Sequence, residues 1–138
     1  MPLFFVFFSC VSSAESLKNF PQIKENVILG KTINIVVDFF QCTNNNQITQ
    51  PVLLGVFTPK AIIVAPHYVT TSLLNFTLNN PRFRDKAIYE FIKYKISDDN
   101  IVKITTQFLD ATNYQPLIED KFELECQLNT AAKIYTNS

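Results

Sequence analysis

Glycine is scarce in this 138-residue chain, and its scarcity excludes one class of site. The only glycines are Gly30 and Gly55, so no glycine-rich loop is present to cradle phosphate groups. The single histidine and three cysteines form no C-x-x-C or H-x-x-x-H pattern of the kind that builds a metal site. We therefore expect neither a cofactor nor a metal.

An excess of charge is also missing. The chain carries 12 basic and 12 acidic residues, for a net charge of zero, so no overall field would attract a polyanion. On this ground we expect no nucleic-acid partner. Hydrophobic residues make up 47% and charged residues 17%, which is typical of a folded chain. The length favours a single domain.

No stretch approaches the ~18 apolar residues that a membrane-spanning helix needs. The first fourteen residues, MPLFFVFFSCVSSA, are instead typical of a signal peptide, because a short apolar run precedes small residues ending at Ala14. No lysine or arginine precedes that run, and the alternative is an N-terminal strand or hydrophobic tail. We predict a signal peptide over residues 1–14, a single mature domain over residues 15–138 without an integral membrane segment, and a periplasmic or secreted location.

Export would account for the cysteines. Cys10 lies in the segment to be removed, which leaves Cys42 and Cys126 as a pair in an oxidising compartment. We predict a disulfide between them. The alternative is two buried free thiols in a cytosolic domain, where either could act as a nucleophile.

Apolar periodicity predicts one helix near the N-terminus. Apolar residues at helical spacing favour a helix over residues 15–29, with Gly30 where a C-terminal cap would fall. Pro21 would kink that helix, so a later start capped by Asn19 is the alternative.

Extended runs follow the helix. They cover residues 32–40, 52–57, 61–65, 67–78, 87–96, 101–109 and 122–128. The first is apolar on both faces, so we expect a central strand covered on each side. Residues 42–51 are predicted to be a polar loop, and Thr58-Pro59-Lys60 the turn of a hairpin. The tail after residue 128 is expected to add an edge strand and fray. The fold class is mainly β (α+β), an antiparallel sheet curled as a barrel or sandwich with one N-terminal helix.

Two polar residues are candidates for chemistry. His67 follows Pro66 at a strand irregularity, where bulges sometimes aim side chains towards a site; a structural or solvent-facing histidine is the simpler interpretation. Asp38 lies in an apolar run, where a carboxylate needs a partner or a raised pKa. It would then act as a general base or a ligand-orienting group. The simpler interpretation is an exposed residue near the strand end, or one that caps the following loop.

One strand face mixes aromatic and basic side chains. Tyr89, Phe91, Lys93 and Lys95 share one face of this strand, opposite Glu90, Ile92 and Tyr94. Faces of this kind can bind single-stranded nucleic acids or sugars. The simpler interpretation is an amphipathic strand with lysines in solvent.

Several segments together are similar to VirK-domain proteins. They are VVDFFQC, APHYV, EFIKYKI, FLDATNYQP and FELECQL, and the similarity covers roughly residues 24–130. That family comprises small exported bacterial proteins encoded among virulence-associated genes. The resemblance implies that Cys42 and Cys126 are paired, makes Asp38, His67 and Tyr94 a candidate surface or ligand site, and implies no reaction.

The function that fits these observations is an exported, non-enzymatic binding or interaction domain. No set of nucleophile, base and orienting group is recognisable. The partner would be a protein or small ligand outside the cytoplasm, and we expect a monomer. Two alternatives stay open: a small secreted hydrolase that uses His67 with a carboxylate, and a carrier of a small apolar ligand inside a barrel.

Overall fold

The computed structural model describes residues 2–7, 14–44, 52–119 and 121–137. In this part of the chain the elements are, in order, β1 (Ala14–Leu17), α1 (Phe20–Ile28), β2 (Ile33–Asp38), a short 3-10 helix η1 (Phe39–Gln41), β3 (Thr43–Asn44), β4 (Leu54–Phe57), β5 (Ile62–Val64), β6 (Tyr68–Thr77), β7 (Ile88–Ser97), β8 (Ile101–Asp110), β9 (Phe122–Gln127) and β10 (Ala132–Asn137). The predicted strands over residues 67–78, 87–96, 101–109 and 122–128 are confirmed to within one or two residues at each end.

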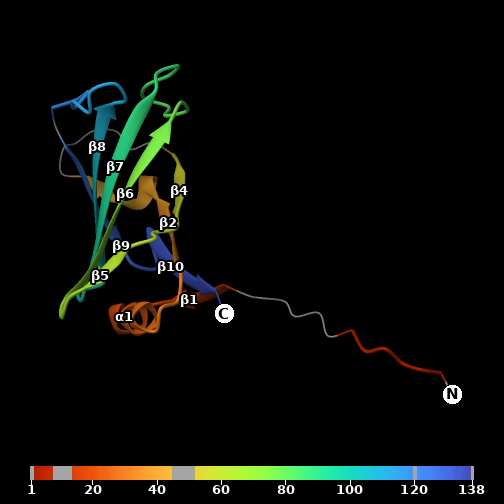
Figure 1. Cartoon of the computed structure of the whole chain (residues 1–138). Helices are drawn as coiled ribbons and strands as arrows, with labels where there is room; N and C mark the ends of the chain where they lie inside the picture. The colour runs from red at the N-terminus through yellow and green to blue at the C-terminus, as the bar shows by residue number, and fades with distance from the viewer. Residues whose placement is uncertain (1, 8–13, 45–51, 120, 138) are drawn as a thin grey trace.

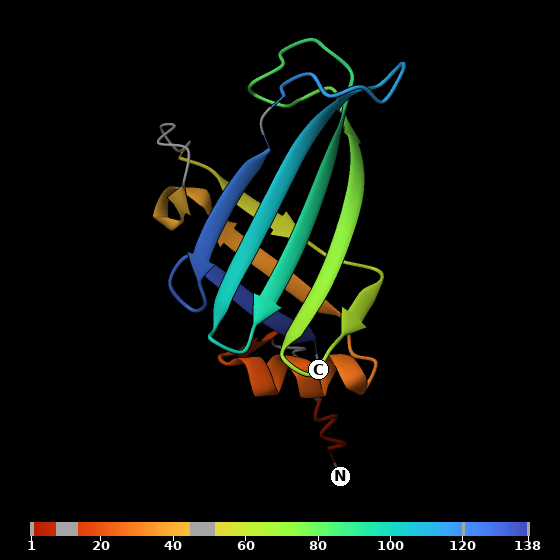
Figure 2. The same cartoon turned by 90° about the vertical axis from the view of Figure 1, so that its left-hand side faces the viewer.

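The strands form two antiparallel sheets that pack face to face (Figure 1). The smaller sheet has the order β1-β10-β2-β4 and the larger has the order β3-β9-β8-β7-β6-β5. The long strands β6, β7 and β8 run across the smaller sheet at a steep angle (Figure 2). The mainly β fold with one helix is confirmed, and of the two predicted arrangements it is the sandwich.

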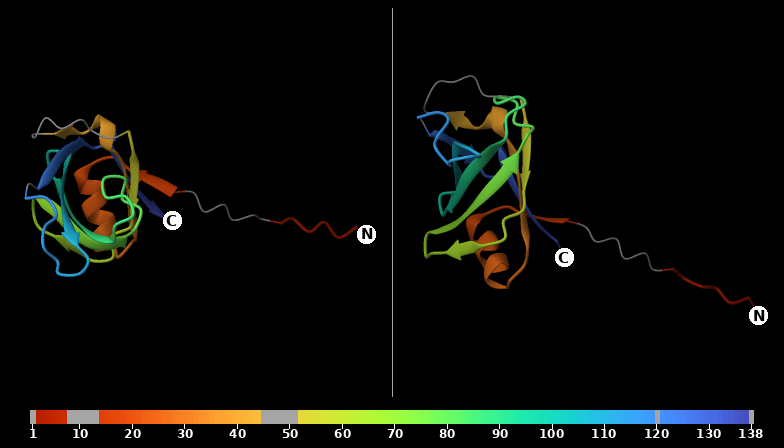
Figure 3. Two further views of the ribbon diagram at one scale, coloured as in Figure 1. Left: turned by 90° about the horizontal axis from the view of Figure 1, so that it is seen from above. Right: turned by 45° about the horizontal axis from the view of Figure 1, so that its top comes forward.

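Helix α1 closes one end of the sandwich, as the view down its length shows (Figure 3, left). Phe20 and Ile23 are buried in the core. The predicted start at residue 15 is wrong, because residues 14–17 pair with β10 as strand β1. The alternative start is right: the side chain of Asn19 accepts a hydrogen bond from the backbone N–H of Gln22 at 3.0 Å. Gly30, with φ +78°, follows the last turn as expected.

The predicted hairpin across Thr58-Pro59-Lys60 is wrong. Strand β4 pairs with β2 in the smaller sheet, whereas β5 pairs with β6 in the larger one. The segment between them therefore crosses from one sheet to the other. Both runs are short and apolar, and such runs carry no local signal of which strand each will meet. In β4, Gly55 makes room for two rings, since a Cβ there would lie 2.6 Å from Phe57 and 2.7 Å from Phe39.

Two further expectations need correction. Strand β2 is central, between β10 and β4, but only one of its faces is buried, and the face that carries Val36 and Asp38 is half-exposed. Strand β10 is not an edge strand, because it lies between β1 and β2. Of the predicted loop over residues 42–51, Cys42 directly follows η1, Thr43 and Asn44 form β3, and residues 45–51 lie outside the described residues.

The core lies between the two sheets and under α1. Ile23 of α1 is fully buried in it. The other fully buried side chains alternate along the strands of both sheets and include Leu17, Ile33, Ile35, Val37, Val69, Tyr94, Ile96, Val102, Ile104 and Ile134. The opposite faces of the same strands are left to solvent, and the candidate binding surface is found there.

Candidate functional site

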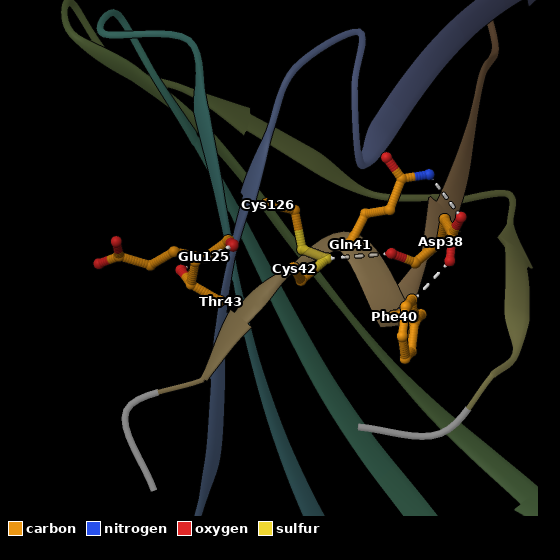
Figure 4. The surroundings of a disulfide bond; sticks show 7 residues. All are labelled: Asp38, Phe40, Gln41, Cys42, Thr43, Glu125 and Cys126. Carbon is orange, nitrogen blue, oxygen red and sulfur yellow. Dashed lines mark hydrogen bonds between the residues drawn. A yellow bond between two sulfur atoms is a disulfide. The ribbon is translucent and has the colours of Figure 1, made fainter. Parts of the chain in front are cut away.

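Cys42 and Cys126 form a disulfide in the structure (Figure 4). Cys42 follows η1, where the chain passes from the smaller sheet to the larger one, and Cys126 lies in β9 of the larger sheet. Thr43 pairs with Glu125, so the two cysteines occupy neighbouring positions of the β3–β9 ladder. Both are buried. The bridge thus fastens the crossover between the sheets to the larger sheet.

Asp38 caps the short helix η1 at the end of β2 (Figure 4). Its carboxylate accepts a hydrogen bond from the backbone N–H of Phe40 at 3.2 Å and another from the Gln41 side-chain amide at 2.7 Å. This is the local capping that the sequence offered as the alternative to a chemical role. The two hydrogen bonds and the partial exposure together account for this carboxylate at the end of an apolar strand.

His67 lies in the turn between β5 and β6, at the end of the sandwich that α1 covers. Its Nδ1 is 2.9 Å from a carboxylate oxygen of Asp98, and the two side chains are 83% and 53% exposed. The histidine therefore does have an acidic neighbour, as the hydrolase alternative requires. That pair sits on an open turn, where solvent screens it and surrounds any substrate.

Tyr94 points from β7 into the core, where its ring centroid lies 5.1 Å from that of Phe57. Burial raises the pKa of the Tyr94 phenol above its ordinary value, and the Glu90 carboxylate adds to the rise. The phenol is therefore protonated at neutral pH and suited to packing. Asp38, His67 and Tyr94 thus occupy three separate places: a strand end of the smaller sheet, an exposed turn and the core.

The buried hydroxyl of Tyr94 has no hydrogen-bond partner among the described residues. An unpartnered buried hydroxyl costs about 1–3 kcal/mol of desolvation. We therefore expect Tyr94→Phe to leave the free energy of unfolding unchanged or to raise it by about 1 kcal/mol, as urea denaturation would measure. Tyr135 of β10 is half-exposed, so Tyr135→Phe is the matched control and should leave the free energy of unfolding unchanged. A loss of more than about 1 kcal/mol in Tyr94→Phe would mean that the hydroxyl has a bound partner.

The outer face of the larger sheet is ordered in rows that run across the strands. The β6–β9 registers place a polar row of Ser72, Lys93, Thr105 and Glu123 beside a mixed row of Leu74, Phe91 and Gln107. The next row pairs Phe76 with Tyr89 and Leu109. The face therefore changes from basic and polar near α1 to aromatic at the far end.

The loop after β8 packs against the aromatic end of this face. Tyr114 stacks on Tyr89, with ring centroids 5.1 Å apart and an interplanar angle of 11°, and a hydrogen bond with Tyr114 raises the pKa of Tyr89. The loop is held by Asp110, whose carboxylate accepts from the backbone N–H of Thr112 at 2.7 Å. This bond lowers the pKa of Asp110, and Lys86 adds to the effect.

A groove of about 640 Å³ crosses the middle of the same face. Its apolar lining includes Ile63 from β5 and Phe91 from β7, and its polar lining includes Ser72, Lys93, Thr105, Gln107 and Glu123. The sequence indicated the contribution of β7, the mixed aromatic and basic face. It did not indicate the hydroxyl and amide groups, because only the strand register brings β6 and β8 beside β7. The signal for them was the alternation of exposed positions in those two strands.

Other kinds of site have less support in the described part of the chain. No group of three or more His, Cys, Asp or Glu side chains is placed to hold a metal ion among those residues. None of the described helices is long and apolar enough to cross a membrane. The space between the sheets, where a carried ligand would sit, is occupied by core side chains.

Comparison with known proteins gives one family. A family model described as VirK protein matches residues 16–114, from β1 to the loop after β8. A crystal structure of a VirK family protein from Legionella pneumophila resembles this fold with a TM-score of 0.76 at 25% sequence identity, and covers 86% of this chain and 97% of that one. A search of curated proteins finds no match. The matched residues include Cys42 but end before Cys126.

Proposed function

This chain belongs to the VirK protein family, and from that membership we propose that it is an exported binding domain without catalytic activity. It acts outside the cytoplasm as a monomer, in a virulence-associated role. It holds its ligand on the outer face of the larger sheet.

Two features support export. Residues 2–7 lie away from the sandwich in Figure 1, and their apolar side chains are exposed, with Phe4 and Phe7 each at 89%. Such a segment is a liability on a mature soluble surface, whereas removal as a signal peptide would eliminate it. The disulfide is the second feature, since structural disulfides persist in oxidising compartments. Cleavage after Ala14 would remove one residue of β1 and leave Glu15–Leu17 paired with β10.

The observation that carries the binding role is the groove on the outer face. It is the place where exposed apolar side chains and polar groups from five strands converge, as they do in binding sites generally. The candidate catalytic group, His67, is exposed on a turn with one carboxylate beside it. A binding domain therefore fits the geometry better than a hydrolase.

Export is tested by intact mass of the protein recovered from the periplasm or medium of an expressing bacterium. We expect the mass of residues 15–138, with two thiols that react with an alkylating reagent only after reduction. Ala14→Leu, which changes the small residue read by signal peptidase, is the control and should accumulate unprocessed. A wild-type chain that stays in the cytosol at full length, with freely alkylating thiols, would overturn the proposal.

A further inference from the structure

We propose that the groove on the outer face of the larger sheet binds an extended acidic oligosaccharide, a chain of sugars that carry carboxylates. This inference rests on the proposed function as an exported binding domain, because it names the ligand class of that same surface. It follows from the groove's length, from the hydroxyl and amide groups in it that have no partner among the described residues, and from Lys93, which has no acidic partner among those residues.

The shape of the groove favours an extended ligand. Its lining runs from Ile63 on β5 to Glu123 on β9, which is four strand spacings, or about 19 Å. The groove is open on the outer face rather than enclosed between the sheets. A compact ligand would leave most of this length unused, whereas a linear chain lying across the strands would occupy it.

The chemistry of the groove favours a sugar chain over a peptide. The groove crosses the middle strands, whose backbone groups already pair with neighbouring strands, so it cannot extend a sheet by pairing with a peptide main chain. It offers the side-chain hydroxyls of Ser72 and Thr105 and the amide of Gln107, and none of these makes a hydrogen bond to another described residue. Sugar hydroxyls both donate and accept, and can use all three.

Phe91 supplies the apolar surface that a sugar ring needs. It lies beside Gln107 in the strand register and remains 39% exposed. One face of a pyranose ring presents C–H bonds, which pack well against the negative face of an aromatic ring. Phe91 and the polar side chains in the adjacent row would therefore contact different parts of one sugar unit.

The charges in and beside the groove favour an acidic chain. The Nζ of Lys103 lies 3.6 Å from a carboxylate oxygen of Glu123, so the carboxylate of Glu123 in the groove is already paired with a cation. Lys95 lies over the ring of Tyr68, 4.6 Å from its centroid. Lys93, between Ser72 and Thr105 in the polar row, has no acidic partner among the described residues. A sugar carboxylate placed there would pair with Lys93, and sugar hydroxyls beside it would reach Ser72 and Thr105 on the two neighbouring strands.

The test is calorimetric titration of the purified, disulfide-bonded protein with oligosaccharides of galacturonate, glucuronate-containing hyaluronan and alginate. We expect at least one to bind, with affinity that falls as salt increases. Fully methyl-esterified oligogalacturonate, which keeps the sugar chain and loses its charge, should bind about tenfold more weakly than the free acid if galacturonate is the ligand. A decamer of glutamate serves as the acidic peptide.

Two variants of the groove and two matched controls complete the test. Phe91→Ala and Lys93→Gln should each weaken binding about tenfold. Phe40→Ala removes an exposed ring outside the groove, and Lys133→Gln removes an exposed charge on the smaller sheet; both should bind like the wild type. Circular dichroism checks that all four fold.

The outcomes separate this inference from the proposed function. Absence of binding to all three acidic oligosaccharides, binding untouched by Phe91→Ala and Lys93→Gln, or equal binding of the glutamate decamer would each overturn the inference. If the chain is nevertheless processed and disulfide-bonded, the proposed export survives. An unprocessed cytosolic chain would overturn the proposed function even if it bound a glycan in vitro.

Discussion

Removing the bridge between Cys42 and Cys126 is expected to lower the free energy of unfolding by about 4 kcal/mol. The two cysteines are 84 residues apart in sequence. A cross-link over such a distance removes many conformations from the unfolded chain, and in the chain-entropy model this effect grows with loop length. The double variant Cys42→Ala/Cys126→Ala avoids leaving one buried thiol without its partner.

The loss is measured by urea denaturation of the oxidised wild type and the double variant. We expect the free energy of unfolding of the variant to depend more steeply on urea, because its unfolded chain is less compact. Thermal denaturation should show a midpoint temperature lower by about 15 °C for a chain of this size. The control is the wild type in reductant, which should approach the variant's stability. A loss below about 1 kcal/mol would mean that strain in the folded state cancels the gain from the cross-link.

The second large effect is expected in the C-terminal strand. Ile134 lies in β10 between Leu17 of β1 and Ile35 of β2, and all three side chains are fully buried. Shortening a buried isoleucine to alanine costs its transfer free energy and leaves a cavity that neighbours in two sheets cannot readily fill. We expect Ile134→Ala to lower the free energy of unfolding by about 3 kcal/mol.

Lys133→Ala is the matched control for this strand. Lys133 is the adjacent residue of β10 and points to solvent, so its replacement should stay within about 0.5 kcal/mol of the wild type. The comparison by urea denaturation tests the position of the strand. If Ile134→Ala cost as little as Lys133→Ala, β10 would behave as the frayed edge that its place at the end of the chain suggests.

The proposed binding surface on the outer face of the larger sheet depends on the stability of that sheet. Its polar and aromatic rows exist only while β6, β7, β8 and β9 keep their register. The disulfide fastens β9 to the crossover from the smaller sheet. It therefore helps to hold in place β9, the strand that carries Glu123. Binding should therefore be measured on protein with this bridge intact.

The sequence by itself determined the local features of this protein. Alternation of apolar and polar residues predicted strands close to β6, β7, β8 and β9, because the side-chain period of a strand is a property of its own residues. The position of Gly30 marked the C-terminal end of the helix, whereas its start was placed at residue 15 and Asn19 was only the alternative. The two cysteines left after residue 14 predicted the bridge from their number alone.

Tertiary structure decided which strands meet. Residues 54–57 and 62–64 are close in sequence and similar in composition, yet they join different sheets. Strand β10 lies within a sheet because β1, from the other end of the chain, covers its free edge. The groove also depends on strand pairing, because Ser72, Lys93 and Thr105 become neighbours only when β6, β7 and β8 pair. Which strands pair depends on contacts between residues far apart in the sequence, and the local pattern of side chains in one strand does not reveal those contacts.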